Sequence, residues 1–256
     1  MSGKKEREKR RQQRLREERE AGAAERRSRL LKLSAGLAFV ALAVLVVVIV
    51  VNASSGGGGD VDLEGVEEVN RELRGIPQDG MALGDPKAPV ELIEFGDLQC
   101  PACAAYAQQI LPQVIEGPIK RGEAKLVFRN FTIIGPESLD AGAAAIAAGA
   151  QGRAWSFIEI FFRNQGGENA GYVTDDFVEA VARAAGVRNL GRFRREAKAE
   201  KAKREVEATT RQAKRLGLTG TPTFAVRGPG SEGLEILDVG SPVDLEAAIE
   251  AAGETG

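Results

Sequence analysis

Two cysteines are the residues of this sequence best suited to covalent chemistry. Cys100 and Cys103 are the only cysteines among 256 residues, and they stand three positions apart in the run Cys100-Pro101-Ala102-Cys103. This spacing on a helix brings both sulfurs onto one face, within reach of a disulfide. Such a pair exchanges electrons with other thiols through a mixed disulfide. A static disulfide, or half of a metal site shared between two chains, is the structural alternative.

The residue types that the sequence lacks exclude several other chemistries. There is no histidine, which removes Ser-His-Asp and Cys-His catalysis and every metal site that needs a histidine ligand. Two cysteines cannot form a four-cysteine zinc site within one chain, and no third cysteine exists for a separate structural disulfide. We therefore expect neither a metal nor a cofactor.

The cysteines lie between a predicted strand and a predicted helix, and this position affects their reactivity. The mainly apolar run 90–95 predicts a strand, and a helical pattern that contains Pro112 follows at 104–115. The N–H groups and the dipole at the start of a helix stabilise a thiolate. We therefore expect Cys100 to be the exposed nucleophile. Cys103, one turn inside the helix, is expected to be the more buried resolving thiol.

The rest of the body predicts alternating strands and helices, and so an α/β fold. Thr174 and Ser241 have the residue type and the position of helix caps. The runs 223–226 and 234–239, separated by residues rich in glycine and proline, predict a hairpin. A second strand is expected at 124–131, and further helices at 139–151, 155–163 and, in one or two pieces, 193–216.

The beginning of the sequence differs from the body in charge. Residues 1–32 carry 13 Lys or Arg and 6 Asp or Glu, a net charge of +7 that leaves −9 for the remainder of a chain whose total is −2. We interpret this segment as a basic cytoplasmic tail that stays solvated. An arm that binds nucleic acid is the alternative, but glutamates dilute the basic run, so we expect no nucleic-acid partner.

An apolar segment follows the basic tail. Residues 33–51 contain no charged side chain, and a helix of this length spans roughly 28 Å, close to the hydrocarbon thickness of a bilayer. The basic flank is N-terminal, so the positive-inside rule predicts a single-pass protein with its body outside the cytoplasm. A signal peptide cleaved near Ala53 is the alternative to a retained transmembrane helix. Residues 52–74 are interpreted as a flexible tether, although the apolar spacing from Leu63 to Leu73 is typical of a short helix.

Three motifs resemble the DsbA-like branch of thioredoxin-fold proteins. They are the run 84–95 followed by the cysteine motif, the run 126–131, and the run 219–224 near the C-terminus. The resemblance covers about residues 75–252. It implies a thioredoxin fold with an inserted helical subdomain at about 137–205, and activity on the cysteine thiols of exported proteins. We interpret the protein as an enzyme that introduces disulfides into such proteins. The resemblance also implies a quinone-linked membrane oxidoreductase as the partner that regenerates the disulfide.

The resemblance assigns roles to residues outside the cysteine motif. The peptide bond before Pro222 would be cis and lie against the active-site disulfide, which leaves the Thr221 backbone free to pair with an extended substrate. We expect Thr221 and Pro101 to contact substrate and Pro222 to take part in catalysis. In this family an acid in this strand assists proton transfer to or from the buried cysteine, and we expect Glu94 to have this role. An ordinary trans proline and a surface-facing Glu94 are the alternatives.

Ala102 is a departure from the family pattern. The best-studied oxidants of the family have a histidine between the cysteines, whereas alanine offers neither a cation nor a side-chain N–H to the Cys100 thiolate. We expect Cys100 to be less acidic than in those proteins and the pair to be a milder oxidant. The sequence alone leaves the direction of exchange open, since the same pair can oxidise, reduce or isomerise. A tethered binding or chaperone module without turnover is the alternative from another class.

Overall fold

The structure, a computed structural model, describes residues 61–238 and 241–254. The predicted tail at 1–32, the predicted transmembrane helix at 33–51 and the first part of the predicted tether lie outside these residues. Within the described ranges, no helix is both long enough and apolar enough to cross a membrane.

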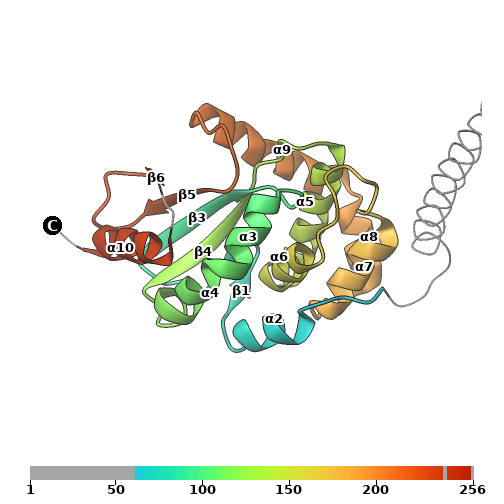
Figure 1. The fold of residues 1–256 in the computed structure, drawn as a ribbon, viewed down its shortest axis with the longest axis horizontal. Helices are drawn as coiled ribbons and strands as arrows, with labels where there is room; N and C mark the ends of the chain where they lie inside the picture. The colour runs from blue at the N-terminus through green and yellow to red at the C-terminus, as the bar shows by residue number, and fades with distance from the viewer. Residues whose placement is uncertain (1–60, 239–240, 255–256) are drawn as a thin grey trace, which may run out of the picture. The chain divides into compact units, whose positions relative to one another are not determined.

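A mixed sheet of six strands forms the centre of the described part of the chain (Figure 1). The strands are β1 (Gln78–Asp79), β2 (Ala82–Leu83), β3 (Val90–Gly96), β4 (Ala124–Asn130), β5 (Thr223–Arg227) and β6 (Glu235–Leu237). They stand in the order β1-β2-β4-β3-β5-β6, so β3 and β4 occupy the middle. These two pair in parallel, with Val90 opposite Ala124, whereas the other neighbours are antiparallel.

The strands agree with the sequence predictions. Strand β3 begins at the predicted residue and runs one residue further, and β4 ends one residue earlier than predicted. Every β3 residue except Glu91 is buried, because helices cover both faces of the sheet, and this explains the nearly continuous apolar run. The predicted hairpin is confirmed by β5 and β6, which place Ala225 opposite Ile236.

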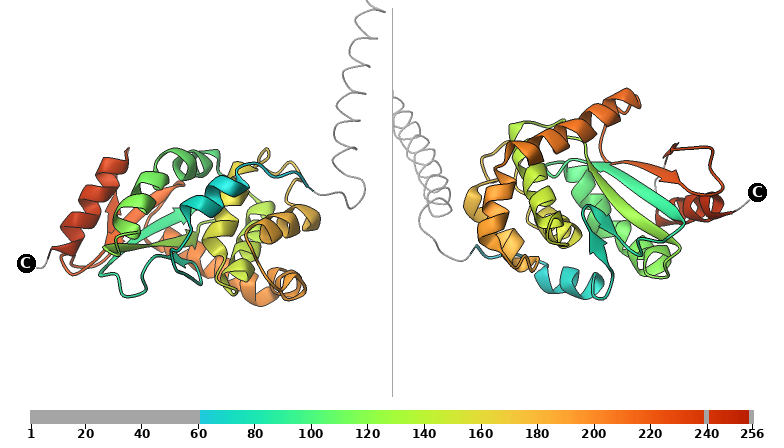
Figure 2. Two further views of the ribbon diagram at one scale, coloured as in Figure 1. Left: turned by 90° about the horizontal axis from the view of Figure 1, so that it is seen from below. Right: turned by 180° about the vertical axis from the view of Figure 1, so that it is seen from behind.

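Different helices cover the two faces of the sheet. They are α3 (Pro101–Gln109), α4 (Leu111–Val114) with the π-helical turn η1 (Ile115–Ile119), α9 (Glu200–Arg215) and α10 (Pro242–Gly253). On one face Phe224 lies 5.6 Å from the ring of Tyr106 of α3, and α10 packs beside α4. On the other face Ile93 and Phe95 pack in one cluster with Ala213 of α9. The rear view in Figure 2 shows α9 beside the strands.

A group of helices connects β4 to β5 and lies at one end of the sheet (Figure 1). Within the described residues these are α5 (Pro136–Gly149), α6 (Ala154–Arg163), α7 (Asp175–Ala184), α8 (Leu190–Ala197) and α9. Rings of α6 attach the group to the sheet, since Trp155 lies edge-on to Phe128 of β4 at 6.1 Å. The predicted helical insertion is present, and α9 continues past residue 205 to Arg215.

Two predicted helix caps are confirmed. The Thr174 hydroxyl accepts a hydrogen bond from the backbone N–H of Phe177 at 3.2 Å, at the start of α7. Ser241 accepts one from Asp244 at 3.4 Å and is followed by Pro242 at the first position of α10. In both cases the side chain satisfies an N–H that has no partner within its helix.

One helix differs from the prediction, and another is confirmed. The helix after the cysteines ends at Gln109, with a break at Ile110, rather than continuing to 115 with a kink. Pro112 explains the break, because it lacks the N–H that would bond to the preceding turn. Helix α2 (Val66–Glu72), with Val69 and the C-cap residue Leu73 buried, confirms the short helix expected from the apolar spacing up to Leu73. The last part of the segment 52–74 is therefore helical rather than a flexible tether.

Candidate active site

Cys100 and Cys103 stand at the beginning of helix α3. Cys100 has extended backbone angles, φ −76° and ψ 118°, and occupies the N-cap, where its carbonyl accepts the first helical hydrogen bond from Ala104 at 3.1 Å. Pro101 takes the next position, where the missing N–H leaves no helical bond unmade, and it is exposed. Cys103 lies at the third helical position. The positive end of the helix dipole therefore lies at the Cys100 sulfur.

The Cys100 sulfur lies against a loop from the far end of the domain. Its thiol donates a hydrogen bond to the carbonyl oxygen of Thr221 at 3.3 Å, and only 7% of the residue is exposed. The expectation of an exposed nucleophile is therefore wrong, because this loop covers the cysteine. The pKa of Cys100 is lowered to about 6, and a hydrogen bond with Cys103 is the largest cause. Burial acts in the opposite direction and raises the pKa. Hydrogen bonds with the Thr221 side chain and with the backbone of Cys103 and Ala102 lower it further.

Cys103 has the opposite character. It is fully buried, and burial, its hydrogen bond with Cys100 and the charge of Glu94 raise its pKa well above the ordinary range of a thiol. Cys100 therefore ionises near neutral pH, whereas Cys103 stays protonated. The prediction that Cys103 is the more buried thiol of the pair is confirmed.

The loop against Cys100 leads into strand β5. The Thr221–Pro222 peptide bond is cis, as predicted from the resemblance. The next residue, Thr223, stands opposite Phe95 near the end of β3. The cysteines follow the same end of β3, so the strand pairing brings residues 221 and 222 to the start of α3.

Glu94 is fully buried on the sheet face that also carries Phe128, its cross-strand neighbour. Burial raises its pKa to about 8, with a smaller contribution from the charge on Cys100. Among the described residues, neither carboxylate oxygen has a hydrogen-bond partner. The alternative of a surface-facing acid is wrong. Glu91, three positions earlier, lies on the opposite face and forms ion pairs with Lys125 and Arg227.

Two buried polar residues just before the cysteines were not identified from the sequence. Asp97 accepts hydrogen bonds from the backbone N–H groups of Ile133 and Ile134 at 2.8 and 3.1 Å, and from that of Gln99 at 2.9 Å. The side-chain oxygen Oε1 of Gln99 accepts one from the backbone N–H of Asn169 at 2.7 Å. These bonds join the loop before Cys100 to the helical insertion. The only signal in the sequence is a polar pair placed between an apolar strand and a cysteine.

The site and the sheet together define a class of protein. A cysteine pair at the start of a helix, next to a cis-proline loop on a mixed sheet, is the arrangement of the thioredoxin fold. In the ranges that the structure describes, no group of three or more cysteine or acidic side chains is placed to hold a metal ion.

Comparisons with known sequences agree with this class. A family model described as Thioredoxin matches residues 77–238, a range that includes both cysteines and Pro222. Probable disulfide bond formation protein D of Bacillus cereus is 30% identical over 151 residues, which cover 57% of this chain and 69% of that protein. Disulfide bond formation protein D of Bacillus subtilis is 26% identical over 146 residues, which cover 56% and 66%.

Solved structures show the same fold. Oxidised BdbD of Bacillus subtilis aligns with a TM-score of 0.59 at 22% identity, over 68% of this chain and 95% of that one. Alpha-DsbA1 of Wolbachia pipientis aligns with a TM-score of 0.57 at 19% identity, over 67% and 89%. The α/β thioredoxin fold with an inserted helical subdomain is thus confirmed. The chain belongs to the thioredoxin family, in its DsbA-like branch, and is a thiol–disulfide oxidoreductase.

Proposed function

We propose that the protein introduces disulfides into exported proteins, using Cys100 and Cys103 as its redox pair. The difference in acidity between the two thiols is the observation that supports this most directly. A thiolate on Cys100 that persists at neutral pH stabilises the reduced pair, and a stabilised reduced form makes the disulfide an oxidant. The names of the Bacillus relatives, which refer to disulfide bond formation, support the same direction.

The proposed reaction consists of two thiolate attacks. A substrate thiolate attacks the sulfur of Cys100 in the Cys100–Cys103 disulfide, the bond between the two enzyme sulfurs breaks, and Cys103 leaves and takes up a proton. A second substrate thiolate then attacks the substrate sulfur of the mixed disulfide, and Cys100 leaves as a thiolate. Two electrons pass from the substrate thiols to the enzyme pair, and the substrate gains one disulfide.

The neighbouring residues have distinct roles in this proposal. Cys103 has a strongly raised pKa and must leave with a proton, and Glu94, whose pKa of about 8 keeps it neutral at pH 7, is the acid that supplies it. The Thr221 backbone and the exposed ring of Pro101 contact the substrate chain beside the sulfurs, and Pro222 shapes this surface.

We also propose that the enzyme acts outside the cytoplasm on a single membrane anchor. Residues 33–51 would form the anchor, 1–32 the cytoplasmic tail and 52–74 the connection to the domain at 75–252, with α5 to α9 as its insertion. The charge and hydropathy of the sequence support this arrangement. Extraction of cell membranes at alkaline pH tests it. An anchored chain stays in the pellet, whereas a chain cleaved near Ala53 is released.

Turnover requires an electron acceptor, because each cycle leaves two electrons on the cysteine pair. We propose a quinone-linked membrane oxidoreductase as this partner, without a cofactor bound to the chain itself. The resemblance to the DsbA-like branch supports this part of the proposal.

Trapping of mixed disulfides tests the function. Cys103→Ala removes the resolving thiol, so mixed disulfides between Cys100 and exported proteins should accumulate and appear as thiol-sensitive bands on non-reducing gels. Cys100→Ser is the matched control and should form none. A Cys100→Ser variant that retains full function in cells would instead identify a binding or chaperone module.

A further inference from the structure

A second buried acid, Glu159 of helix α6, lies in the core beneath the active site. It is fully buried, and within the described residues neither of its carboxylate oxygens has a hydrogen-bond partner. An unpaired acid in a protein core costs several kcal/mol if it is charged, and less if it stays protonated. Burial, together with the charges of Glu72 and Glu94, raises the pKa of the Glu159 carboxyl well above its usual range, which favours the protonated acid.

The packing of α6 places Glu159 close to Glu94. Trp155 and Phe162 both contact the ring of Phe128, with centroid distances of 6.1 and 6.4 Å. Glu159 is four positions after Trp155 and three positions before Phe162, so all three side chains lie on the same face of the helix. Phe128 is the cross-strand neighbour of Glu94. A Cβ on Gly96 would lie 2.6 Å from this ring and 3.2 Å from Oε1 of Glu94, so ring and carboxylate lie side by side.

Glu159 also lies close to the surface at helix α2. Arg163, one turn later on α6, forms an ion pair with Glu72 of α2 at 3.7 Å, and their side chains are 19% and 12% exposed. Arg163 crosses the start of α2, where a Cβ on Gly65 would come within 2.3 Å of its Cδ. One oxygen of Glu72 has no hydrogen-bond partner in the described part of the chain. The acids therefore form a series from Cys103 through Glu94 and Glu159 to Glu72 at the rim.

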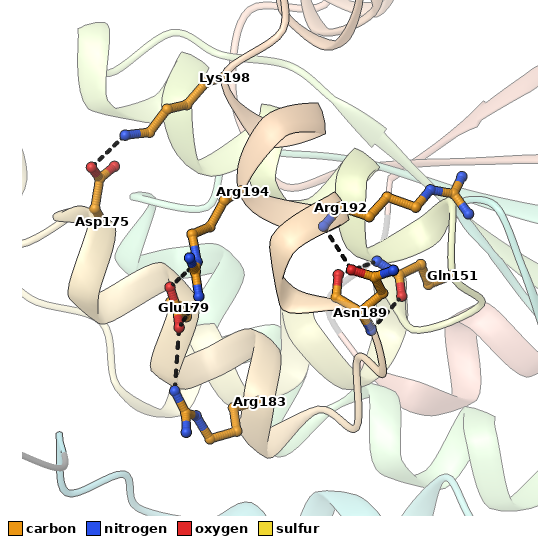
Figure 3. Close-up of polar contacts among 8 residues, drawn as sticks. All are labelled: Gln151, Asp175, Glu179, Arg183, Asn189, Arg192, Arg194 and Lys198. Carbon is orange, nitrogen blue, oxygen red and sulfur yellow. Dashed lines mark hydrogen bonds and ion pairs between the residues drawn. The ribbon is translucent and has the colours of Figure 1, made fainter.

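Other charges near α6 are engaged elsewhere. Helix α3 carries no charged residue and contributes only Cys103 and Tyr106 as titratable groups, and β2 carries neither kind. Two acids of α7 form ion pairs, as Figure 3 shows: Asp175 pairs with Lys198 just after α8, and Glu179 pairs with Arg183 of α7 and Arg194 of α8. Of the two acids of α5, Glu137 accepts backbone hydrogen bonds and Asp140 pairs with Lys203. The remaining acids of α7 and β1, Asp176 and Asp79, are exposed.

We propose that Glu159 is a proton-relay residue that connects Glu94 to solvent through Glu72, at the α2–α6 edge of the domain. This inference rests on the proposed function. When the disulfide opens, the Cys103 thiolate takes a proton from Glu94, Glu94 takes one from Glu159, and Glu159 takes one from Glu72, which is reprotonated by solvent. One proton enters per disulfide reduced, and the two electrons remain on the cysteines. The relay runs in reverse when the disulfide forms again.

Stopped-flow fluorescence on the full-length protein tests the relay. Trp155, the single tryptophan, contacts Phe128 next to Glu94 and reports on the core. The rate at which a small dithiol reduces the disulfide is measured from pH 5 to 9. Glu159→Gln cannot release a proton and should slow this step about tenfold or more near pH 7. This is less than the roughly 100-fold at the low end of what general acid catalysis contributes, because Glu94 keeps its own proton for the first transfer. Glu68→Gln, an exposed acid of α2, is the matched control and should match the parent.

The double variant separates a relay from a structural effect. If both acids serve one route, Glu94→Gln with Glu159→Gln should be no slower than Glu94→Gln alone, whereas independent effects would multiply. A Glu159→Gln profile that coincides with the parent, or multiplied losses, would overturn the relay. If Glu159→Gln does not fold, the same rate is measured for Glu72→Gln. Slower reduction of the disulfide in Glu72→Gln supports the relay, and an unchanged rate overturns it. A parent protein that does not exchange disulfides at all contradicts the proposed function instead.

Discussion

The Cys100 thiol donates a hydrogen bond to the carbonyl oxygen of Thr221 at 3.3 Å, across 121 positions of sequence. The Thr221 side chain also bonds to this sulfur and contributes to lowering its pKa. A single loop residue therefore covers the nucleophile and adjusts its acidity. Because the acidity of this thiol affects the potential of the pair, the loop before β5 is part of the redox site.

Thr221→Val should make Cys100 less acidic. Valine keeps the shape of the side chain and the backbone carbonyl but removes the hydroxyl that bonds to the thiolate. A hydrogen bond to a charged group contributes about 1.5 kcal/mol, which corresponds to a rise of about one pH unit in the pKa of Cys100. Thiolate absorbance near 240 nm, followed against pH in the reduced protein, measures this shift.

Thr209→Val is the control for that substitution. The Thr209 hydroxyl donates only to α9 carbonyl groups, those of Val206 at 2.9 Å and Glu205 at 3.3 Å, so the same chemical change occurs away from the cysteines. Its Cys100 titration should coincide with that of the parent. Equal titrations for all three proteins would show that the Thr221 hydroxyl does not act on the sulfur.

The reduction potential of the pair should lie between those of thioredoxin and DsbA. The Cys100 pKa of about 6 falls between about 7 for thioredoxin and about 3.5 for DsbA. We therefore expect a potential above about −270 mV and below about −120 mV in a glutathione-equilibrated fluorescence titration. Ala102→His, which places a cation near the thiolate at an exposed position, should raise it. A parent value near −120 mV would contradict the role given to Ala102, and one near −270 mV would favour a reductase.

Local signals in the sequence predicted the parts of the site that depend on neighbouring residues. The position of the cysteines after an apolar strand indicated that Cys100 stands at the start of a helix. Hydroxyl side chains at 174 and 241 were correctly assigned as caps. The three-residue offset between Glu91 and Glu94 places the two side chains on opposite faces of the strand. Each of these depends on backbone geometry within a few residues.

Features that depend on long-range packing were not predictable in the same way. The burial of Cys100 depends on Thr221, which reaches it only because β5 pairs with β3. Glu159 occurs in a helix rich in apolar residues, but nothing in its local sequence shows that the helix turns it toward Glu94. The three backbone hydrogen bonds accepted by Asp97 come from two separate loops.

Asp97→Asn should destabilise the domain. The fully buried carboxylate accepts one backbone N–H on Oδ1 and two on Oδ2. An asparagine has one acceptor oxygen, so its amide group must face at least one of these donors and leave it unpaired. Such an unpaired buried group costs about 1–3 kcal/mol. Urea unfolding of the oxidised protein measures the loss.

Asp140→Asn is the matched control for Asp97→Asn. Asp140 is an exposed partner of Lys203 at 2.8 Å, and exposed ion pairs contribute about 0–1 kcal/mol. The two variants make the same chemical change, so a larger loss at position 97 reports burial and the backbone donors. Equal losses would show that Asp97 does not hold the two loops together.

Glu94→Gln should stabilise the reduced protein relative to the parent by an amount that grows as the pH rises. Burial raises the pKa of Glu94 from 4.5 to about 8, so between these values the unfolded chain loses this proton and the folded chain keeps it. The free energy of unfolding of the parent therefore falls from pH 4.5 to about 8 because of this group. Glutamine removes that dependence. The difference in urea unfolding between variant and parent should grow across this window and stay constant above it.

Glu91→Gln, on the same strand, should change the free energy of unfolding with pH in the opposite direction to Glu94→Gln. Ion pairs and hydrogen bonds with Arg227 and Lys125 outweigh partial burial and lower the pKa of Glu91. The stability that ionised Glu91 contributes is therefore present above pH 4.5 and is lost as the pH falls through the pKa of Glu91 in the folded protein. The variant should be less stable than the parent at neutral pH and approach it in acid. Two glutamates three positions apart would then respond oppositely to pH because one faces the core and the other faces a pair of cations. Parallel pH profiles for the two variants would contradict this assignment of their environments.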